Sequence, residues 1–509
     1  MLATAPSATL HGIEGQPVLV EVHVSTGLPA FHVIGQPDTT CRESRDRVRA
    51  ALLSSGLKWP QLKVTVNLSP SGLKKIGAGL DLPIAVALLA ADEQLGLECL
   101  EERSFLGELG LDGTVRPVPG ALPLVDALES PEIVVPLGSV TEARLLGRHR
   151  VRAVADLSTL VPALRGEIPW PDLPACPEVV PGPPEPDLAD VRGQPTARWA
   201  VEVAAAGGHH LLLVGPPGAG KSMLARRLPG LLPDLQPSAA LEATRIHSAA
   251  GMPLPPGGLM QRPPFRRPHH NASAVSLVGG GSASIQPGEI SLAHRGVLFL
   301  DELGEFDSGV LDNLRQPLEE GVIRISRASL KATLPARFLM VAAMNPCPCG
   351  EGGPQGACNC SRSVWDRFAR KISGPLLDRF DLRLEVGRPD AAEMLADADE
   401  GPPVEPTAVV AARVHSARAR ARRRGVAANG ELQPWQLDAE APLSGSARRL
   451  VEQAMRRGRL TGRGLGGVRR VALTIADLMG HEPPLSADHI SLALAFRTEP
   501  TSRFGREAS

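Results

Sequence analysis

Short apolar runs in the middle of the chain have the pattern of strands buried in a sheet. Leu211 to Val214 and Val297 to Leu300 each contain four consecutive apolar residues, and Phe338 to Ala343 extends the pattern to a third segment. Parallel strands that are covered on both faces require such uninterrupted runs. After Thr407 the pattern changes to helices rich in Ala, Leu and Arg. The chain is therefore predicted to hold a central α/β domain followed by a helical domain.

Two proline-bearing segments divide the chain. Glu167 to Asp187 (EIPWPDLPACPEVVPGPPEPD) is rich in proline and acid, and proline favours extended structure because it lacks an amide donor. A weaker break, Pro389 to Pro406, is acidic and contains Pro and Gly. We therefore expect a first domain over residues 1–166, a linker over 167–189, a central domain over 190–388 and a helical domain over 407–509.

Length and charge narrow the class of protein. The 509 residues, 43% of them hydrophobic, can form two or three separate cores. The chain has 54 Lys and Arg residues and 55 Asp and Glu residues. Because these charges nearly cancel, a charged partner is expected to bind a local patch of charge. Met1 to Gly15 lacks the features of a signal peptide, and the longest apolar segment, Leu82 to Ala91, is too short to span a bilayer. We expect a cytoplasmic protein without a membrane partner.

The strand at Leu211 to Val214 runs directly into a phosphate-binding loop. The loop consists of Gly215, Pro216, Pro217, Gly218, Ala219, Gly220, Lys221 and Ser222. Its glycines let backbone amides point at phosphate oxygens, Lys221 reaches the outer phosphates of ATP, and the Ser222 hydroxyl ligates Mg²⁺. A glycine-rich turn without function is the alternative, but strand, complete motif and helix together favour a nucleotide site.

Two further strand ends supply polar groups for the same site. Val297 to Leu300 ends in Asp301 and Glu302, at the sheet edge where an α/β protein binds its nucleotide. Asp301 would hold Mg²⁺, and Glu302 would polarise the attacking water. The third strand leads to Asn345, whose amide can contact the γ-phosphate or position that water. From spacing alone, an Asn that makes an ordinary strand-end turn explains the residue better.

Four of the seven cysteines cluster after the third strand. One residue separates Cys347 from Cys349 and Cys358 from Cys360, and a glycine-rich segment joins the two pairs. Four thiolates gathered by a loop over residues 347–360 can bind a structural Zn²⁺ tetrahedrally, with no position left open for catalysis. The usual zinc knuckle has two residues between paired ligands, so a reduced loop with free thiols is the alternative.

Several longer motifs go beyond general nucleotide binding. They are DLADVRGQ (Asp187 to Gln194), the phosphate-binding loop, Pro268-His269-His270, GEISLAHRGVLFLDE (Gly288 to Glu302), AAMNPCPCG (Ala342 to Gly350) and GPLLDRFD (Gly374 to Asp381). Together they resemble the magnesium-chelatase-like AAA+ proteins, and more narrowly the ComM/YifB branch of that family. The resemblance covers nearly the whole chain and implies ATP and Mg²⁺ as cofactors. It assigns Lys221 and Ser222 to Walker A, Asp301 and Glu302 to Walker B, and Asn345 to the first sensor.

The resemblance also implies assembly into a ring. Arg379 matches the arginine finger of the family, which reaches the nucleotide of a neighbouring subunit. A planar guanidinium suits this role because it stays charged and spans the oxygens of the transferring phosphoryl group. A structural Arg–Asp pair is the alternative. A finger supplied in trans implies a closed homo-oligomer, and the family implies a hexamer.

Two further motifs also match the family, namely the lid helix of the second sensor and a pair of adjacent histidines. Val468 to Leu478 resembles the lid helix of the second sensor, with Arg470 at the matching position. Gly464, Gly466 and Gly467 replace bulkier residues there and predict a loose start of the helix. The adjacent His269 and His270 are interpreted as structural or as sensors of the nucleotide state.

The first domain is similar to the α+β Lon-protease-like (S5-like) domain that precedes the motor in this family, and Leu62 to Leu68 is one of its predicted strands. Proteolysis by that fold needs a Ser activated by a Lys. Lys75 to Asp81 (KIGAGLD), where a peptidase presents its Ser, contains none, and Ser69 and Ser71 lie in a Pro/Gly turn. We expect a binding or assembly module without peptidase activity.

Two basic segments are candidates for DNA contact. Gly321 to Pro335 resembles the hairpin that ring motors of this clade point into their pore, with Arg327 and Lys331 near its tip. Arginines close together in the helical domain can neutralise phosphates and release counterions, although a solvated helix face is the alternative. These arginines are Arg418, Arg420, Arg422, Arg423 and Arg424.

The resemblance implies a ring motor that acts on single-stranded or branched DNA, as a helicase in branch migration during natural transformation and recombination. The alternative is a magnesium-chelatase-type motor subunit that remodels a protein partner, although such a subunit is expected to lack the first domain. The missing Ser disfavours an ATP-dependent protease, and the intact phosphate-binding loop disfavours a scaffold without enzymatic activity.

Overall fold

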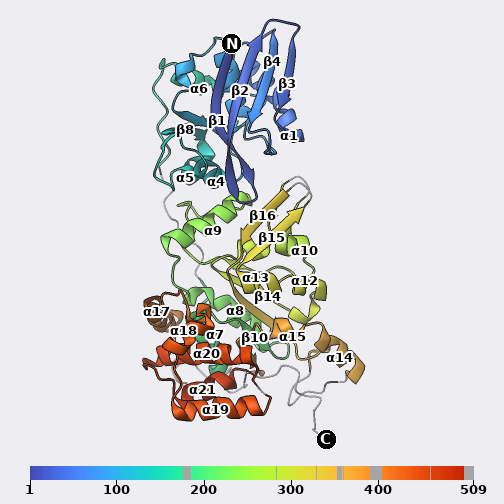
Figure 1. The fold of residues 1–509 in the computed structure, drawn as a ribbon, viewed down its shortest axis with the longest axis vertical. Helices are drawn as coiled ribbons and strands as arrows, with labels where there is room; N and C mark the ends of the chain where they lie inside the picture. The colour runs from blue at the N-terminus through green and yellow to red at the C-terminus, as the bar shows by residue number, and fades with distance from the viewer. Residues whose placement is uncertain are drawn as a thin grey trace.

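Three units follow one another along the longest axis of the molecule in the computed structural model (Figure 1). The α/β fold class is confirmed, with an α+β unit first, a parallel sheet in the middle and helices at the C-terminal end. The structure describes residues 1–175, 185–281, 284–327, 330–351, 358, 360–389, 404–458 and 460–497, without the side chains of Arg327, Leu330 and Arg362. Residues 176–184 of the predicted linker and 498–509 of the predicted helical domain lie outside the described residues.

The N-terminal unit is built on a four-stranded sheet with the order β1-β2-β4-β3. Neighbouring strands are antiparallel except for β3 and β4, which are parallel. Helix α3 is buried along its whole length because apolar residues occupy all of its faces. The strands of this sheet are β1 (Leu2–His11), β2 (Glu14–Ser25), β3 (Ala30–Ile34) and β4 (Lys63–Ser69).

Helices and two smaller sheets complete this unit. The helices are α1 (Thr39–Arg42), α2 (Ser44–Ser54), α3 (Asp81–Ala91), α4 (Ala121–Asp126), α5 (Val140–Ala143) and α6 (Leu157–Leu164). The smaller sheets consist of β5 (Arg103–Phe105), β8 (Glu132–Pro136) and β9 (Arg150–Val154), and of β6 (Glu108–Leu109) with β7 (Val115–Arg116).

The central unit contains a five-stranded parallel sheet with the order β11-β14-β17-β10-β18. The strands are β10 (Leu211–Val214), β11 (Phe265–Arg266), β14 (Val297–Leu300), β17 (Leu339–Met344) and β18 (Leu382–Glu385). β10 and β14 have the predicted bounds, and β17 lies one residue later than predicted. Because the strands are parallel, the phosphate-binding loop, Asp301 and Asn345 all follow strands at the same edge of the sheet.

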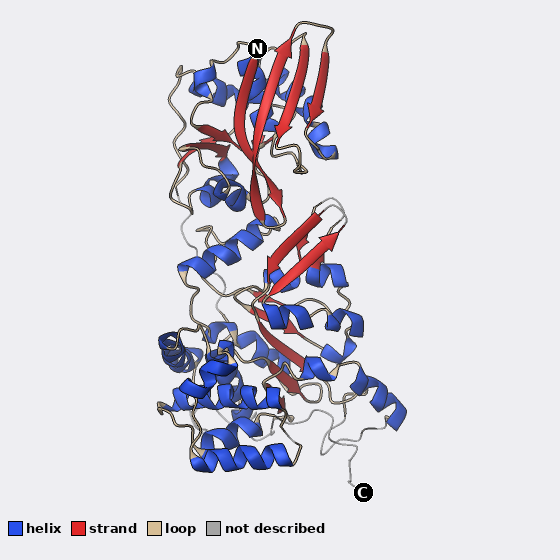
Figure 2. Ribbon diagram, in the orientation of Figure 1, coloured by secondary structure: helices blue, strands red, loops and turns tan. Residues whose placement is uncertain are grey.

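Helices surround this sheet, and the central unit also has two hairpins, the longer of which extends outward (Figure 2). The helices are α7 (Pro195–Gly207), α8 (Lys221–Arg227), α9 (Pro237–Ala249), α10 (Ala274–Val278), α11 (Glu289–Leu292), α12 (Ser308–Asp312), α13 (Arg315–Glu320), α14 (Arg362–Arg370) and α15 (Gly374–Leu377). The hairpins are β12 (Gly279–Gly280) with β13 (Gln286–Pro287), and β15 (Val322–Arg327) with β16 (Leu330–Pro335). The second hairpin lies within the predicted segment Gly321 to Pro335.

The C-terminal lid packs on one face of the parallel sheet. Leu211, Leu213 and Val341 share an apolar cluster with the lid residue Val468, whereas Leu212 and Met340 belong to a cluster on the other face. This division follows from the alternation of side chains along a strand. The lid helices are α17 (Thr407–Arg423), α18 (Pro434–Glu440), α19 (Gly445–Arg456), α20 (Gly462–Met479) and α21 (Ala487–Ala495).

The glycines do not prevent α20 from beginning at Gly462, and the loosening of its first turn stays a prediction. The Thr461 hydroxyl caps the helix by accepting a hydrogen bond from Gly464 N at 3.1 Å. A Cβ on Gly467 would lie 2.6 Å from Asp381 Oδ1, so glycine permits close packing of the lid on the central unit. His209 reinforces this contact, with Nδ1 3.2 Å from Asp381 Oδ2 and Nε2 2.9 Å from Thr474 Oγ1.

None of the helices in the described part of the chain combines the length and the apolar character needed to cross a bilayer.

Candidate functional site

Lys221 lies at the centre of a polar site at the carboxyl edge of the parallel sheet. Its Nζ donates hydrogen bonds to the carbonyl oxygens of Gly215 and Pro216 at 2.6 and 2.9 Å, and to Asn345 Oδ1 at 3.2 Å. The side chain is buried, and this burial lowers the pKa of Lys221 while the nearby Asp301 raises it. A desolvated ammonium group that touches only neutral oxygens favours an anionic partner such as phosphate.

Glycine gives the phosphate-binding loop its backbone shape. Gly218 and Gly220 have φ angles of +80° and +83°, a region that other residues seldom adopt. A Cβ built on either residue meets no atom within 4 Å, so the loop borders open space there.

Ser222 and Asp301 form a pair of oxygen ligands suited to a divalent cation. Ser222 Oγ lies 2.9 and 3.1 Å from the two carboxylate oxygens of Asp301. Octahedral Mg²⁺ holds its oxygen ligands at about 2.0–2.1 Å, which places adjacent ligands roughly 2.9 Å apart. The hydroxyl and the carboxylate therefore fit a shared Mg²⁺ without rearrangement.

The carboxylates of Asp301 and Glu302 both contact basic residues that follow β11. Arg267 donates to Asp301 Oδ2 at 2.6 Å, and His270 Nδ1 lies 3.0 Å from Glu302 Oε2. Glu302 has a φ of +55°, which turns the chain sharply at the end of β14. Sequence reasoning did not single out Arg267 and gave His270 no place in the site. These contacts follow from the pairing of β11 with β14, which brings the residues after the two strands together and which the sequence does not reveal.

Arg379 and Arg470 make contacts that do not involve the phosphate-binding loop. Arg379 ion-pairs with Glu319 of α13, and its side chain is only 16% exposed. Arg463 of the lid lies 3.5 Å from the same carboxylate. Arg470 Nε donates to the carbonyl oxygen of Leu432 within the lid at 2.9 Å. The partner of Arg379 is thus a glutamate from another helix and not the neighbouring aspartates considered from sequence.

The expected patch of five arginines on α17 is not one free surface. Arg418 donates through Nε and NH2 to the carbonyl oxygen of Ala205 at 2.9 and 2.6 Å. Arg424 binds both carboxylate oxygens of the buried Asp477 at 2.6 and 2.7 Å. Arg420 lies 3.4 Å from Glu482 Oε1. The assignment of Arg418 and Arg424 to DNA contact is therefore wrong, because both guanidinium groups bind acceptors inside the protein, whereas Arg422 and Arg423 are exposed.

The β15–β16 hairpin places Lys331 near its outer end. Ser326 pairs with Lys331 and Arg327 with Leu330 in the antiparallel register, and Lys331 is exposed. The side chain of Arg327 and the residues at the tip, 328 and 329, lie outside the described residues.

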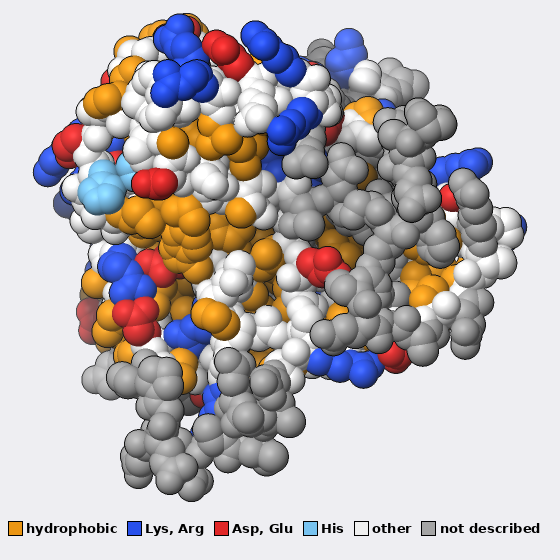
Figure 3. All heavy atoms as spheres, turned by 90° about the horizontal axis from the view of Figure 1, so that it is seen from below, with side chains coloured by type: hydrophobic (Ala, Val, Ile, Leu, Met, Phe, Trp, Pro, Cys, Tyr) orange, Lys and Arg blue, Asp and Glu red, His pale blue; other side chains and the backbone are white. Residues whose placement is uncertain are grey.

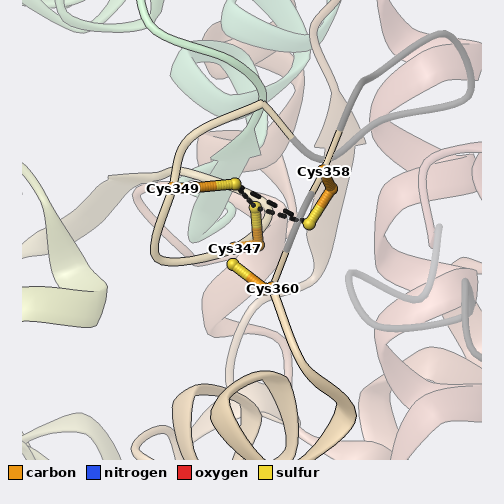
Figure 4. Close-up of side chains that lie close together, drawn as sticks. All are labelled: Cys347, Cys349, Cys358 and Cys360. Carbon is orange, nitrogen blue, oxygen red and sulfur yellow. Dashed lines mark hydrogen bonds between the residues drawn. The ribbon is translucent and has the colours of Figure 1, made fainter.

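The four clustered cysteines converge on one point (Figure 4). Cys347 Sγ lies 3.2 Å from Cys349 Sγ and 3.6 Å from Cys358 Sγ, and Cys349 and Cys358 are 3.7 Å apart. With Cys360, all four sulfur atoms lie within 4.8 Å of one another. Tetrahedral Zn²⁺ with Zn–S bonds of about 2.3 Å holds its sulfurs roughly 3.8 Å apart, so the cluster fits that ion. Hydrogen bonding from Cys347 lowers the pKa of Cys349 to about 7, which favours a thiolate ligand.

Three family models match successive parts of the chain. Residues 187–394 match "Magnesium chelatase, subunit ChlI", residues 20–138 match "Subunit ChlI of Mg-chelatase", and residues 404–497 match "Magnesium chelatase, subunit ChlI C-terminal". The first of these includes the phosphate-binding loop, Asp301, Glu302, Asn345, Arg379 and the four clustered cysteines.

Proteins with closely related sequences match the chain over nearly its whole length. An uncharacterised protein of Mycobacterium tuberculosis is 44% identical, over 97% of this chain and 98% of the relative. YifB of Escherichia coli is 41% identical, over 96% and 95% of the two chains. The competence protein ComM of Haemophilus influenzae is 39% identical, over 97% of each.

Proposed function

The chain belongs to the ComM/YifB family of magnesium-chelatase-like AAA+ proteins, and we propose that it is an ATP-hydrolysing ring motor that acts on DNA as a helicase in branch migration. One observation carries the ATPase part of the proposal: Lys221, Asn345, Ser222 and Asp301 meet through hydrogen bonds at the carboxyl edge of the sheet. This arrangement supports binding of a nucleotide with its Mg²⁺ between Ser222 and Asp301.

ATP bound at this site would supply the γ-phosphoryl group that is transferred to water. Lys221 exchanges its bonds to Gly215 and Pro216 for bonds to phosphate oxygens, because a charged acceptor is the stronger partner. Glu302 orients and polarises the attacking water, and Asn345 positions it beside the phosphate. Arg267 and His270 contact the carboxylates of Asp301 and Glu302 and orient them.

A ring completes the site in this proposal. Arg379 reaches the nucleotide of a neighbouring subunit after leaving Glu319, and Arg470 acts as the second sensor. Apolar surface on the lid supports a subunit contact: Trp435 is 74% exposed, and Met455 and Met479 are also exposed. The end of the molecule formed by the lid gathers apolar side chains near its middle, with Lys and Arg toward the edge (Figure 3).

DNA is the proposed partner because the full-length relatives include YifB and the competence protein ComM, and because Lys331, Arg422 and Arg423 are exposed basic groups. Lys331 and Arg327 on the hairpin and Arg422 and Arg423 on α17 are the proposed contacts. The deciding experiment measures ATP hydrolysis with no DNA, with single-stranded DNA and with branched DNA. We expect stimulation by both DNAs, and unwinding of the branched one. Hydrolysis that is indifferent to DNA would favour the alternative motor that remodels a protein partner.

Neutralising two exposed arginines should weaken DNA binding without regard to sequence. For Arg422→Ala/Arg423→Ala, the loss of two phosphate contacts should reduce the slope of log K against log salt by roughly 1.4 for single strands. ATP hydrolysis without DNA should be unchanged. Fluorescence anisotropy at several salt concentrations measures the slope, and Arg45→Ala/Arg49→Ala, which removes two exposed arginines from α2, is the matched control. An unchanged slope would assign Arg422 and Arg423 to a solvated surface.

We further propose that Cys347, Cys349, Cys358 and Cys360 hold a structural Zn²⁺. The full-length protein, purified under reducing conditions without chelator, should carry about one zinc per chain. Cys347→Ser should lower that content, because it removes one of four ligands, and should destabilise the loop. Metal analysis by mass spectrometry tests this, with Cys99→Ser, a buried cysteine of the N-terminal unit, as control. Protein that contains no zinc would identify the cluster as free thiols.

A further inference from the structure

The tip of the β1–β2 hairpin in the N-terminal unit packs into the central unit. Ile13, at this tip, is only 6% exposed and belongs to the same apolar cluster as Ile323 and Leu334, which form the base of the β15–β16 hairpin. A Cβ on Gly12 would lie 3.2 Å from Ala332 Cβ, and the φ of Gly12 is +66°. Figure 1 shows the lower end of the β1–β2 hairpin beside the β15–β16 hairpin at the junction of the units. The N-terminal unit therefore touches the proposed DNA hairpin directly.

A second contact fixes the N-terminal unit on α9. Arg245 of α9 ion-pairs with Asp126 at the end of α4, and the Ser248 hydroxyl donates to Glu142 of α5. Gly120 N donates to the carbonyl oxygen of Ser248 at 2.9 Å. These contacts are polar and directional, so they set the orientation of the N-terminal unit as well as its position.

Helix α9 in turn holds the starts of the catalytic strands. Glu242 of α9 accepts hydrogen bonds from His294 Nε2 and Arg295 Nε, both at 3.1 Å, just before β14. His294 Nδ1 accepts from Arg337 N at 3.1 Å, just before β17. Burial lowers the pKa of His294 to about 4, so the neutral ring can donate on one side and accept on the other. The starts of the strands that end in Glu302 and Asn345 are thus joined to α9.

We propose that the N-terminal unit is a positioning element of the motor. Ile13 holds the β15–β16 hairpin while α4 and α5 hold α9, so that the hairpin moves together with the strands that carry Asp301, Glu302 and Asn345. The hairpin continues into α13 through Gly321 and into β17 through residues 336–338, and the Ile13 contact adds a support from the N-terminal unit to these chain connections. This inference rests on the proposed DNA-dependent ATPase activity and assigns the N-terminal unit a role in that activity.

Ile13→Ser in the full-length chain tests the coupling. ATP hydrolysis without DNA should stay within about twofold of wild type, because the nucleotide site is untouched, whereas stimulation by DNA should fall by about tenfold. Amide hydrogen exchange in Val322 to Ser326 should rise, since the hairpin loses its apolar support. Ile13→Val should restore both properties. Leu28→Ser, an 88% exposed leucine beyond the far end of β2, is the matched control and should change neither.

Three outcomes would overturn the inference. They are wild-type hydrogen exchange in the hairpin of Ile13→Ser, wild-type stimulation by DNA in that variant, and an equal loss of hydrolysis with and without DNA, which would mean a merely structural role. Ile13→Ala, a smaller change, replaces Ile13→Ser if the latter does not fold. If the wild-type protein is not stimulated by DNA, the proposed function fails separately, and hydrogen exchange still decides whether Ile13 positions the hairpin.

Discussion

Replacing Glu302 with Gln is expected to reduce ATP turnover by about 10²–10⁴-fold while ATP binding persists, because Glu302 polarises the attacking water and does not hold the nucleotide. Lys221→Ala should instead weaken ATP binding itself, since Lys221 provides the buried positive charge of the phosphate-binding loop. Phosphate release measures the turnover, and a fluorescent ATP analogue measures the binding. The two variants thus separate chemistry from binding at one site.

The structure offers a matched control for Glu302. Glu305 is an exposed glutamate on the next turn of the chain, so Glu305→Gln changes the same functional group without approaching the loop. Its turnover should equal that of the wild type. Glu302→Gln with wild-type turnover would remove Glu302 from the catalytic role, and would leave its contact with His270 as a structural one.

Arg379→Ala should lower the turnover of the assembled ring by about 10³–10⁵-fold, the usual contribution of an arginine finger. Mixing Arg379→Ala subunits with Lys221→Ala subunits should restore part of the activity. In randomly mixed rings about a quarter of the interfaces pair an intact phosphate-binding loop with an intact finger. Turnover as a function of mixing ratio, with native mass spectrometry to show that the rings are mixed, provides the measurement.

Glu319 distinguishes a finger from a structural ion pair. Arg379 is paired with Glu319 in the isolated chain, so a purely structural role predicts that Glu319→Gln reproduces the loss seen with Arg379→Ala. A finger predicts that Glu319→Gln keeps its turnover, because only the resting partner of Arg379 is removed. Absence of rescue in mixed rings, together with an equal loss in Glu319→Gln, would contradict the finger.

Features that depend on residues adjacent in the chain could be predicted from the sequence. A strand buried on both faces needs consecutive apolar residues, which placed β10 and β14 at their observed bounds. Asp301 and Asn345 could then be assigned to one edge of the sheet, since parallel strands share that edge. The family assignment was likewise readable from motifs and is confirmed by full-length relatives.

Partners distant in sequence could not be predicted. The arginine run on α17 looked like one patch, but Arg418 binds the carbonyl of Ala205 and Arg424 binds Asp477. The spacing of the cysteines predicted a zinc site with free thiols as the alternative, and only the folded loop shows that the four sulfur atoms meet. The sequence shows which side chains are present, but it does not show which groups each side chain contacts in the folded protein.

The sequence by itself determined the parallel-strand core, the phosphate-binding loop and the acidic strand end, because each depends on residues adjacent in the chain. Only the tertiary structure decided that His270 contacts Glu302, that Glu319 holds Arg379, and that Ile13 supports the β15–β16 hairpin. Those contacts depend on how sheets, helices and domains pack against each other, and that packing brings together groups whose separation along the chain carries no signal of their approach.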